Sequence, residues 1–412
     1  MKKSLLLLTV WLTATGLQAQ SPEGNWYGKL SLGIQKLGIA LQFATDNAGK
    51  SKVTMDVPEQ GIKALPADVL LCSPDSVSLN FPVIGASYTG RIAGTTLNGL
   101  FHQNGLTLPL KLEKQSTPQA RRPQEPQPPL PYTTEEVVFT NPTAGVSLAG
   151  TLTYPVGYKQ GDKVKAVLMV SGSGTQNRDE EILEHKPFLV MADFLARNGI
   201  ASLRYDDRGA GKSTGRPDSC TTADFAADAQ AGMEWLKRNK GWKTGVLGHS
   251  EGGTIAFMLG AKGQADFIVS MGGVGIKGDS LLAEQRNALA RLNNAPGLWT
   301  AEKVRAQFAA APANPWFDFF INYDPAADVR QTKVPVMAIN GSKDMQVLPG
   351  SNLQTIRQLL HDGNRKNLFK EYPGLNHLFQ HCTTGSPTEY YHIEETLSPE
   401  VMRDIAGWIN AL

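Results

Sequence analysis

The sequence predicts a two-domain protein in which a small all-β domain precedes an α/β domain with a parallel sheet and a helical insert. Three observations support this prediction. Short stretches in which apolar residues alternate with polar or small ones fill the chain from about residue 25 to residue 113. A proline-rich segment comes next, and after it apolar strand-like stretches alternate with helical patterns, which is typical of a parallel sheet. A chain of 412 residues is long enough for two domains.

The first residues are typical of an export signal. Lys2 and Lys3 precede an apolar stretch from Leu5 to Leu12, which is too short to span a bilayer, and Ala19 is a small residue that suits cleavage. We therefore expect a signal peptide over residues 1–19, export to the periplasm or the medium, and no membrane span after signal removal. Loss of the two lysines takes the formal net charge from +2 to zero, which argues against nucleic acid as a partner.

The expected β-domain covers residues 20–115 and contains no catalytic constellation. Its alternating stretches predict a small sandwich or barrel. The clearest of them are Leu37–Phe43, Val53–Val57, Ser76–Phe81 and Leu106–Leu112. An alternative function for the protein is a glycan-binding or protein-binding role centred on this domain, in which Trp26, Tyr27 and Tyr88 stack on sugars.

Residues 116–131 form the expected linker. Six prolines in this segment favour an extended polyproline conformation, which continues neither a sheet nor a helix.

The α/β domain is expected over residues 132–412. Its predicted strands are 137–139, 148–154, 166–170, 200–203, 246–247, 267–271, 334–339 and 368–372, and its main helices are 187–198, 222–240, 254–259, 352–361 and 399–412. Between about residues 275 and 328 only helical patterns occur, broken by proline and glycine. An insert at this point in the chain is predicted to form a cap.

The pentapeptide Gly-His-Ser-Glu-Gly at residues 248–252 carries the strongest chemical motif. A short apolar strand precedes it and a helical pattern follows it directly. In such a strand–turn–helix the central residue has a strained backbone, so the flanking positions must be small. Ser250 at the apex is the candidate nucleophile. The backbone N–H of Glu251, at the helix N-terminus, is a candidate oxyanion donor.

A serine nucleophile needs a base and a carboxylate that orients the base. Asp344 lies just past the predicted strand that follows the insert, and His377 lies just past the next strand. The order Ser250, Asp344, His377 is the one expected for a sheet of this type. The weaker alternatives are Asp328 and Asp362 for the acid and His381 for the base.

The second oxyanion donor is expected in the small-residue loop Ser171-Gly172-Ser173-Gly174, which follows a buried strand. By position we assign the N–H of Ser173, with Gly172 as the alternative. The seven histidines and three cysteines show no metal-ligand spacing, so no metal is expected. Cys220 and Cys382 both fall in loops expected near the site, and a disulfide between them is a further hypothesis.

Six blocks of the sequence together resemble the α/β-hydrolase-fold carboxylesterases. The narrower resemblance is to exported bacterial esterases with an N-terminal β-domain and a serine-aminopeptidase-like hydrolase domain. The blocks are residues 171–180 (SGSGTQNRDE), 204–213 (RYDDRGAGKS), 248–253, 316–320 with 323–325, 341–344 and 376–380. The resemblance implies hydrolysis of short-chain acyl esters without a cofactor, and it implies Ser250, Asp344 and His377 as the triad.

Other residues of these blocks have structural explanations beside functional ones. Arg178, Asp179 and Glu180 are expected to hold the loop of residues 171–174 through ion pairs. Asp206 and Arg208 are expected to do the same for the loop after Arg204, and an effect of these residues on the site itself is the alternative. Trp316, Phe317 and Phe320 have helical spacing, so we expect them in the core of the cap, with one or two lining an acyl pocket.

The expected substrate is a small-molecule or carbohydrate ester. A serine peptidase of the aminopeptidase kind is the alternative on the same fold. Such an enzyme needs carboxylates to hold a substrate amine, and the predicted cap has Glu284, Glu302 and Asp318 but no acidic cluster.

Overall fold

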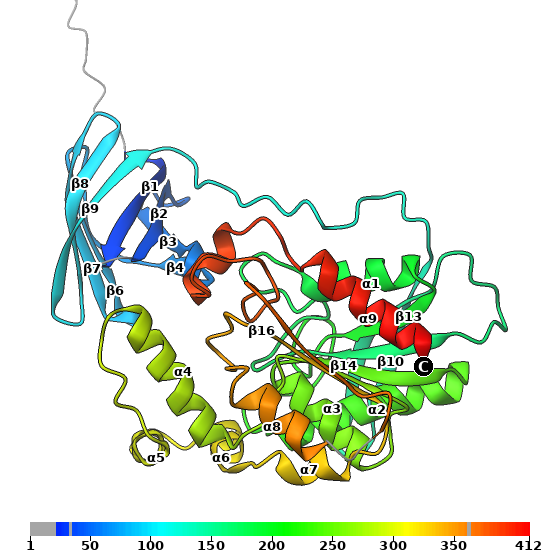
Figure 1. The fold of residues 1–412 in the computed structure, drawn as a ribbon. Coiled ribbons are helices and arrows are strands. Elements are labelled where there is room, and N and C mark those ends of the chain that lie inside the picture. The colour runs from blue at the N-terminus through cyan, green and yellow to red at the C-terminus, as the bar shows by residue number, and fades with distance from the viewer. Residues whose placement is uncertain (1–21, 33–34, 361–363) are drawn as a thin grey trace, which may run out of the picture. The chain divides into compact units, whose positions relative to one another are not determined.

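The computed structural model describes residues 22–32, 35–360 and 364–412 (Figure 1). The chain divides into two compact units, Met1–Pro118 and Gln119–Leu412. The predicted signal peptide, residues 1–19, lies outside the described residues.

The described part of the N-terminal unit forms one antiparallel sheet of nine strands in the order β4-β3-β2-β1-β9-β8-β7-β6-β5. The strands are β1 (Gly24–Leu32), β2 (Gln35–Thr45), β3 (Ser51–Val57), β4 (Ile62–Pro66), β5 (Asp68–Cys72), β6 (Ser76–Phe81), β7 (Ala86–Ala93), β8 (Thr96–Gln103) and β9 (Leu106–Lys114), with short 3-10 turns η1 (Pro58–Gln60) and η2 (Pro82–Ile84).

The two strands at the ends of this order, β4 and β5, are separated by a single residue, Ala67. β4 pairs with β3, β5 pairs with β6, and the Ala67 N–H donates to the Val53 carbonyl at 2.9 Å. One continuous stretch therefore joins the two ends, so the sheet closes on itself instead of stacking two sheets.

The aromatic residues expected to stack on sugars are all buried. Trp26 and Tyr88 are each 1% exposed, and Tyr27 is 8% exposed. The rings of Trp26 and Tyr88 form part of the apolar core that stabilises the unit. The prediction that they stack on a glycan is therefore wrong.

The C-terminal unit is built on an eight-stranded sheet in the order β10-β11-β13-β12-β14-β15-β16-β17. The strands are β10 (Thr134–Asn141), β11 (Val146–Thr153), β12 (Lys165–Val170), β13 (Ile200–Tyr205), β14 (Lys243–His249), β15 (Ile268–Met271), β16 (Val336–Gly341) and β17 (Leu368–Tyr372). β11 is antiparallel to both of its neighbours, and the pairs from β13 to β17 are parallel.

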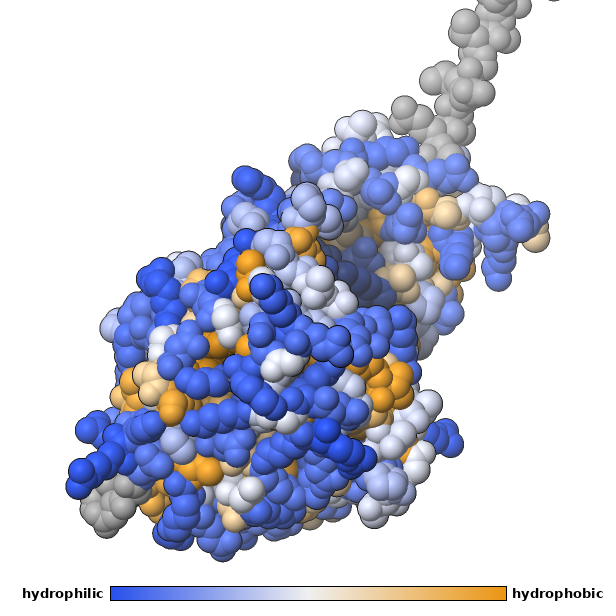
Figure 2. All heavy atoms as spheres, turned by 90° about the vertical axis from the view of Figure 1, so that its right-hand side faces the viewer, coloured by the Kyte–Doolittle hydropathy of each residue, from blue (hydrophilic) through white to orange (hydrophobic). Residues whose placement is uncertain are grey.

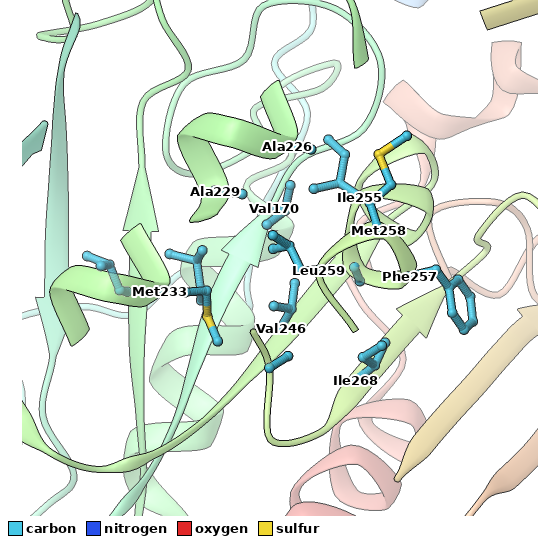
Figure 3. Packing of buried hydrophobic residues seen from close by; sticks show 14 of the residues in the cluster. Val170, Ala226, Ala229, Met233, Val246, Ile255, Phe257, Met258, Leu259 and Ile268 are labelled. Carbon is cyan, nitrogen blue, oxygen red and sulfur yellow. The ribbon is translucent and has the colours of Figure 1, made fainter. Parts of the chain in front are cut away.

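Helices cover both faces of this sheet. The pleat of β12 sends Leu168 and Val170 into one apolar core and Val167 and Met169 into the other. One core is closed by α2 (Thr222–Lys240), α3 (Glu251–Ala261), α7 (Ala326–Gln331) and α8 (Asn352–Leu359), and the other by α1 (Pro187–Arg197) and α9 (Pro399–Ala411). Figure 3 shows side chains of α2 and α3 packed against β12, β14 and β15.

The ends of α2 illustrate how the sequence sets these helices. Thr221 and Asp224 form a reciprocal capping box, in which Asp224 Oδ2 accepts from the Thr221 N–H at 2.8 Å. Gly241 ends the helix in the left-handed conformation, with φ of 61°. The predicted bounds of this helix, 222–240, are those of the structure.

The helical insert lies between β15 and β16 and contains α4 (Gly278–Leu292), α5 (Ala301–Ala309) and α6 (Pro315–Asn322). These three helices share a small core around Ala283, Val304 and Ile321. The fourth helix, α7, packs on the sheet through Val329. The cap therefore ends near residue 322, before the predicted limit of 328.

On the face of the molecule shown in Figure 2, hydrophilic residues predominate and hydrophobic residues gather only in small, separate patches. No helix formed by the described residues combines the length and the apolar character that crossing a membrane requires.

Candidate active site

Ser250 lies at a sharp turn between β14 and α3, with φ of 54° and ψ of −118°. This is a strained conformation for a residue other than glycine. A Cβ on Gly248 would lie 2.0 Å from the Gly252 carbonyl oxygen, and a Cβ on Gly252 would lie 2.0 Å from the Val170 carbonyl oxygen. Both glycines are therefore required for β14, α3 and β12 to approach this closely. The Ser250 N–H is held by the Met271 carbonyl at 2.9 Å.

Asp344 and His377 follow β16 and β17 and are both buried. The His377 Nδ1 donates to Asp344 Oδ2 at 2.7 Å. The other oxygen, Oδ1, accepts from the backbone N–H groups of Gln346 and Val347, each at 2.8 Å. These bonds fix the carboxylate, so the carboxylate in turn fixes the ring and leaves Nε2 of His377 as the available nitrogen.

Ser250 and His377 line one cavity of about 350 Å³. Trp316 and Phe320 of the cap also line it, as predicted for one or two of the cap aromatics. Phe317 does not line it, because its ring stacks on Phe308 at 4.6 Å within the cap. The remaining lining residues are Gly172, Ser173, Gln176, Glu180, Ile182, Leu183, His249, Val274, Leu281, Leu282, Gln285, Gln346, Val347, Leu378, Pro387 and Tyr390.

The small-residue loop after β12 lies at the same cavity. Its Gly172 N–H already donates to Glu180 Oε1 at 2.7 Å, and the next residue, Ser173, lines the cavity. Glu251 is the first residue of α3, where backbone N–H groups have no partner within the helix. Of the two loop positions, Ser173 therefore suits an oxyanion donor better than Gly172.

Glu180, which is expected to hold the loop of residues 171–174 through an ion pair, forms a buried pair with His249, a partner that was not anticipated from the sequence. Glu180 Oε1 is 2.9 Å from His249 Nδ1, and His249 Nε2 is 3.0 Å from the His377 carbonyl oxygen. Burial lowers the pKa of His249, but the Coulombic attraction of Glu180 and the hydrogen bond to it outweigh burial and raise that pKa. The pair joins the Gly172 loop to the loop that carries His377. Its position inside the pentapeptide, directly before Ser250, was the available signal for His249.

Arg178 and Asp206 form one of the predicted ion pairs. The guanidinium meets the carboxylate in two bonds, Nε to Oδ1 at 3.1 Å and Nη2 to Oδ2 at 2.8 Å. The hydrogen bonds that Arg178 donates to Asp206 raise the pKa of Arg178. Neither side chain lines the cavity. The pair therefore connects the segment that follows the loop of residues 171–174 to the end of β13 from outside the site.

Arg208 also forms an ion pair that holds the loop after Arg204, and its partner lies on α2. Its Nε is 2.6 Å from Asp228 Oδ2 of α2, and its Nη1 is 3.3 Å from Cys220 Sγ. Cys382 instead approaches the Gly374 carbonyl, and both cysteines are free thiols. The hypothesis of a disulfide between Cys220 and Cys382 is therefore wrong.

Asp207, the neighbour of these two residues, holds the Gly172 loop directly. Its Oδ2 accepts from Ser171 Oγ at 3.0 Å and from the Gln176 N–H at 2.9 Å. Burial raises the pKa of this carboxyl to about 7. The sequence offered two adjacent aspartates, and only the structure distinguishes their partners.

The Glu251 carboxylate connects the turn to the cap. It is 3% exposed, and its Oε1 accepts from Trp316 Nε1 at 2.9 Å and from Thr222 Oγ1 at 2.6 Å. Burial raises its pKa. Glu251 thus has a side-chain contact with α6 in addition to the backbone N–H that the sequence suggested.

The alternative base His381 and the alternative acid Asp328 do not line the cavity. His381 has a side chain that is 64% exposed and pairs with Glu395 at 2.8 Å. Asp328, at the start of α7, accepts from the Tyr323 hydroxyl. Asp362 lies outside the described residues.

Comparison with known proteins adds sequence evidence to this geometry. Residues 185–310 match the family described as "Serine aminopeptidase, S33". Esterase EstD of Thermotoga maritima is 26% identical over 274 residues, which are 64% of this chain and 65% of EstD. The C-terminal unit is similar to these proteins and has the α/β-hydrolase fold. The match spans about two thirds of the length of EstD.

Two solved structures are similar to this chain, and the first is described as an esterase. An esterase of Pyrococcus furiosus is 17% identical with a TM-score of 0.47, covering 72% of this chain and 99% of that one. Est1E of Butyrivibrio proteoclasticus is 16% identical with a TM-score of 0.44, covering 67% and 100%.

Proposed function

We propose that this α/β-hydrolase is a serine carboxylesterase that hydrolyses short-chain acyl esters of small, uncharged molecules through an acyl-enzyme intermediate. One observation carries the proposal. Ser250 is held in a strained turn and shares a cavity with His377, whose Nδ1 is 2.7 Å from Asp344. The sequence similarity to EstD, an esterase, supports it.

In the proposed mechanism, His377 Nε2 accepts the proton of the Ser250 hydroxyl as the oxygen attacks the ester carbonyl. Asp344 stabilises the resulting imidazolium. The backbone N–H groups of Ser173 and Glu251 donate to the oxyanion, and each such donor is typically worth about 3 to 4 kcal/mol of barrier. His377 then protonates the leaving alcohol. It next deprotonates a water molecule, which releases the acid and restores Ser250.

The cavity supports the choice of substrate class. Its volume of about 350 Å³ is at the lower end of the range for ligand pockets, roughly 300 to 1,000 Å³, which favours a small ester. Gln176, Gln285 and Gln346 line it beside apolar side chains. Amides of this kind hydrogen-bond uncharged hydroxyl and carbonyl groups, as in a small-molecule or carbohydrate ester.

A serine aminopeptidase is the second candidate, because the matching family carries that description. Such an enzyme must receive a substrate ammonium at a carboxylate. Among the described residues that line the cavity, Glu180 is the one carboxylate, and it is 1% exposed and bound to Gly172 and His249. The ammonium therefore lacks an accessible partner, which favours the ester.

Active-site labelling tests the nucleophile. A fluorophosphonate should add once to the wild-type protein, with the mass shift on the peptide that contains Ser250, and should not add to Ser250→Ala. Ser78→Ala, in the N-terminal unit, is the matched control and should label like the wild type. Labelling of Ser250→Ala at the wild-type rate would refute the assignment.

A hydrolysis panel tests the substrate. Activated esters of increasing acyl length, acetylated sugars and amino-acid amides should be compared by kcat/KM. We expect the highest values for short acyl esters and none above background for amides with a free amine. Faster hydrolysis of those amides would favour the aminopeptidase.

Export belongs to the same proposal and rests on the pattern of residues 1–19. N-terminal sequencing of the protein recovered from periplasm and medium should find a chain that begins after Ala19. A full-length chain retained in the cytoplasm would contradict it.

A further inference from the structure

Part of the proline-rich segment predicted to be a linker is fastened to the α/β-hydrolase unit through Arg122. Besides the carbonyl of the preceding residue, the guanidinium donates to four backbone carbonyls from distant parts of the chain, those of Leu183 at 2.9 Å, Glu184 at 3.2 Å, Tyr391 at 2.9 Å and Ile393 at 3.1 Å. The first two carbonyls belong to the loop of residues 181–186, and the other two belong to the segment of residues 387–397. One side chain therefore joins two stretches that are about two hundred residues apart in the chain.

The residues after Arg122 extend the same attachment. Gln124 accepts from the N–H groups of Thr396 and Leu397 at 2.5 and 3.0 Å and donates to the Leu397 carbonyl at 2.8 Å. Glu125 pairs with Lys186 at 3.0 Å. Both joined stretches thus receive more than one bond from residues 122–125, which we call the strap.

The joined stretches form part of the substrate cavity. Leu183 of the first and Pro387 and Tyr390 of the second line it. His185 of the first stretch is fully buried, and its Nε2 is 2.8 Å from the Tyr390 carbonyl of the second. The strap therefore lies behind a part of the cavity wall that the catalytic residues do not supply.

The loop of residues 181–186 needs such support. Leu183 and Glu184 have φ of 50° and 66°, which is the left-handed region that residues other than glycine rarely adopt. Conformations of this kind persist where surrounding contacts hold them, and Arg122 binds the carbonyls of both residues. A guanidinium offers five donors in a fixed plane, whereas a lysine ammonium offers three on a flexible stem. Binding four carbonyls from two stretches therefore requires the donors of a guanidinium, because an ammonium has too few.

We propose that Arg122 is a positioning residue of the active site, which sets the cavity wall formed by Leu183 and Tyr390, so that the strap belongs to the substrate-binding machinery. The inference rests on the proposed esterase function, because the substrate that meets this wall is the ester. The bonds of the strap go to residues 183–186 and 391–397 and not to Ser250 or the oxyanion donors, so Arg122 should affect large substrates and leave the smallest ones little changed.

Steady-state kinetics of Arg122→Ala and Arg122→Lys in the full-length protein test this role. Hydrolysis of a small acetate ester and of an ester with a bulky alcohol should be measured side by side. We expect KM for the bulky ester to rise roughly tenfold in Arg122→Ala, with kcat and the acetate KM within about twofold of wild type. Arg122→Lys should recover only part of the loss, and added methylguanidinium should recover part of it in Arg122→Ala. The neighbouring Arg121, whose side chain is 77% exposed, supplies the matched control Arg121→Ala, which should behave as wild type.

Hydrogen exchange read by mass spectrometry gives a measure that does not depend on catalysis. Arg122→Ala should exchange faster than wild type and Arg121→Ala at residues 181–186 and 387–397, with the sheet core unchanged. Equal KM changes for both esters, or unchanged exchange in both stretches, would overturn the proposal. If the wild type hydrolyses no ester at all, the esterase function fails, and the exchange comparison still decides whether Arg122 holds the wall.

Discussion

Replacing Glu180 with alanine tests whether the buried Glu180–His249 pair holds the active site together. Glu180 Oε1 accepts from the Gly172 N–H at 2.7 Å and lies 2.9 Å from His249 Nδ1, and both contacts are buried. The variant leaves these two donors without their acceptor. We expect a large loss of both stability and turnover.

The expected loss of stability follows from the burial of the groups that Glu180 contacts. An unsatisfied buried donor costs about 1 to 3 kcal/mol, and removal of one partner of a buried ion pair costs about 3 to 5 kcal/mol. We therefore expect the free energy of unfolding to fall by about 3 to 5 kcal/mol. Because Gly172 precedes the proposed donor Ser173, loss of its anchor should also reduce kcat by about 10² to 10³, as for a missing oxyanion donor.

The pH dependence provides a second readout. Since the pKa of His249 is raised in the folded state above the ordinary value of 6.5, the contribution of the pair is fully present below that value. It is lost as the pH rises through the raised pKa. This decrease in stability with rising pH should be absent in Glu180→Ala, because the carboxylate that raises the pKa of His249 has been removed.

Urea denaturation followed by circular dichroism, below and above the ordinary histidine pKa, measures both effects. Glu181→Ala is the matched control, because this neighbour is exposed and should stay within about 0.5 kcal/mol of wild type. A Glu180→Ala protein as stable as Glu181→Ala, with unchanged kcat, would refute the reasoning.

Three further predictions concern single positions. Asp344→Asn keeps an acceptor for the neighbouring backbone but no longer fixes the His377 tautomer, so kcat in an ester assay should fall about 10⁴-fold with little change in melting temperature; a loss below tenfold would contradict this. Burial raises the pKa of Asp207 to about 7, so the folded state binds its proton more tightly than the unfolded state. The free energy of unfolding should therefore fall as the pH rises from 3.8 to about 7, by at most about 1.4 kcal/mol per pH unit, and denaturation of Asp207→Asn should lack this slope. Gly252→Ala places a Cβ 2.0 Å from a carbonyl oxygen and should lose about 3 kcal/mol of stability, whereas Gly407→Ala on α9 meets open space and should gain about 0.5 to 1 kcal/mol. Equal melting temperatures for these two alanine variants would contradict the packing argument.

Much of the α/β unit could be predicted because its signals are local. The helix 222–240 carries its own capping box and terminal glycine, so its predicted ends agree with those of the structure. The cap limit was placed too late because α7 has the same helical pattern as α4 to α6. Its assignment to the sheet depends on where Val329 packs, and that is a tertiary contact.

The sequence alone determined the turn at Ser250, because glycines at 248 and 252 and a serine between them follow from one local geometry. It also placed Asp344 and His377 after strands, because the apolar stretches that form these strands, and the points where they end, can be recognised locally in the sequence. Tertiary structure decided which side chains support them. Glu180 meets His249 across about seventy residues and Arg122 meets Tyr391 across 269 residues, and no local pattern encodes a contact between segments so far apart. Such pairs form only when the sheet and its loops bring distant parts of the chain together.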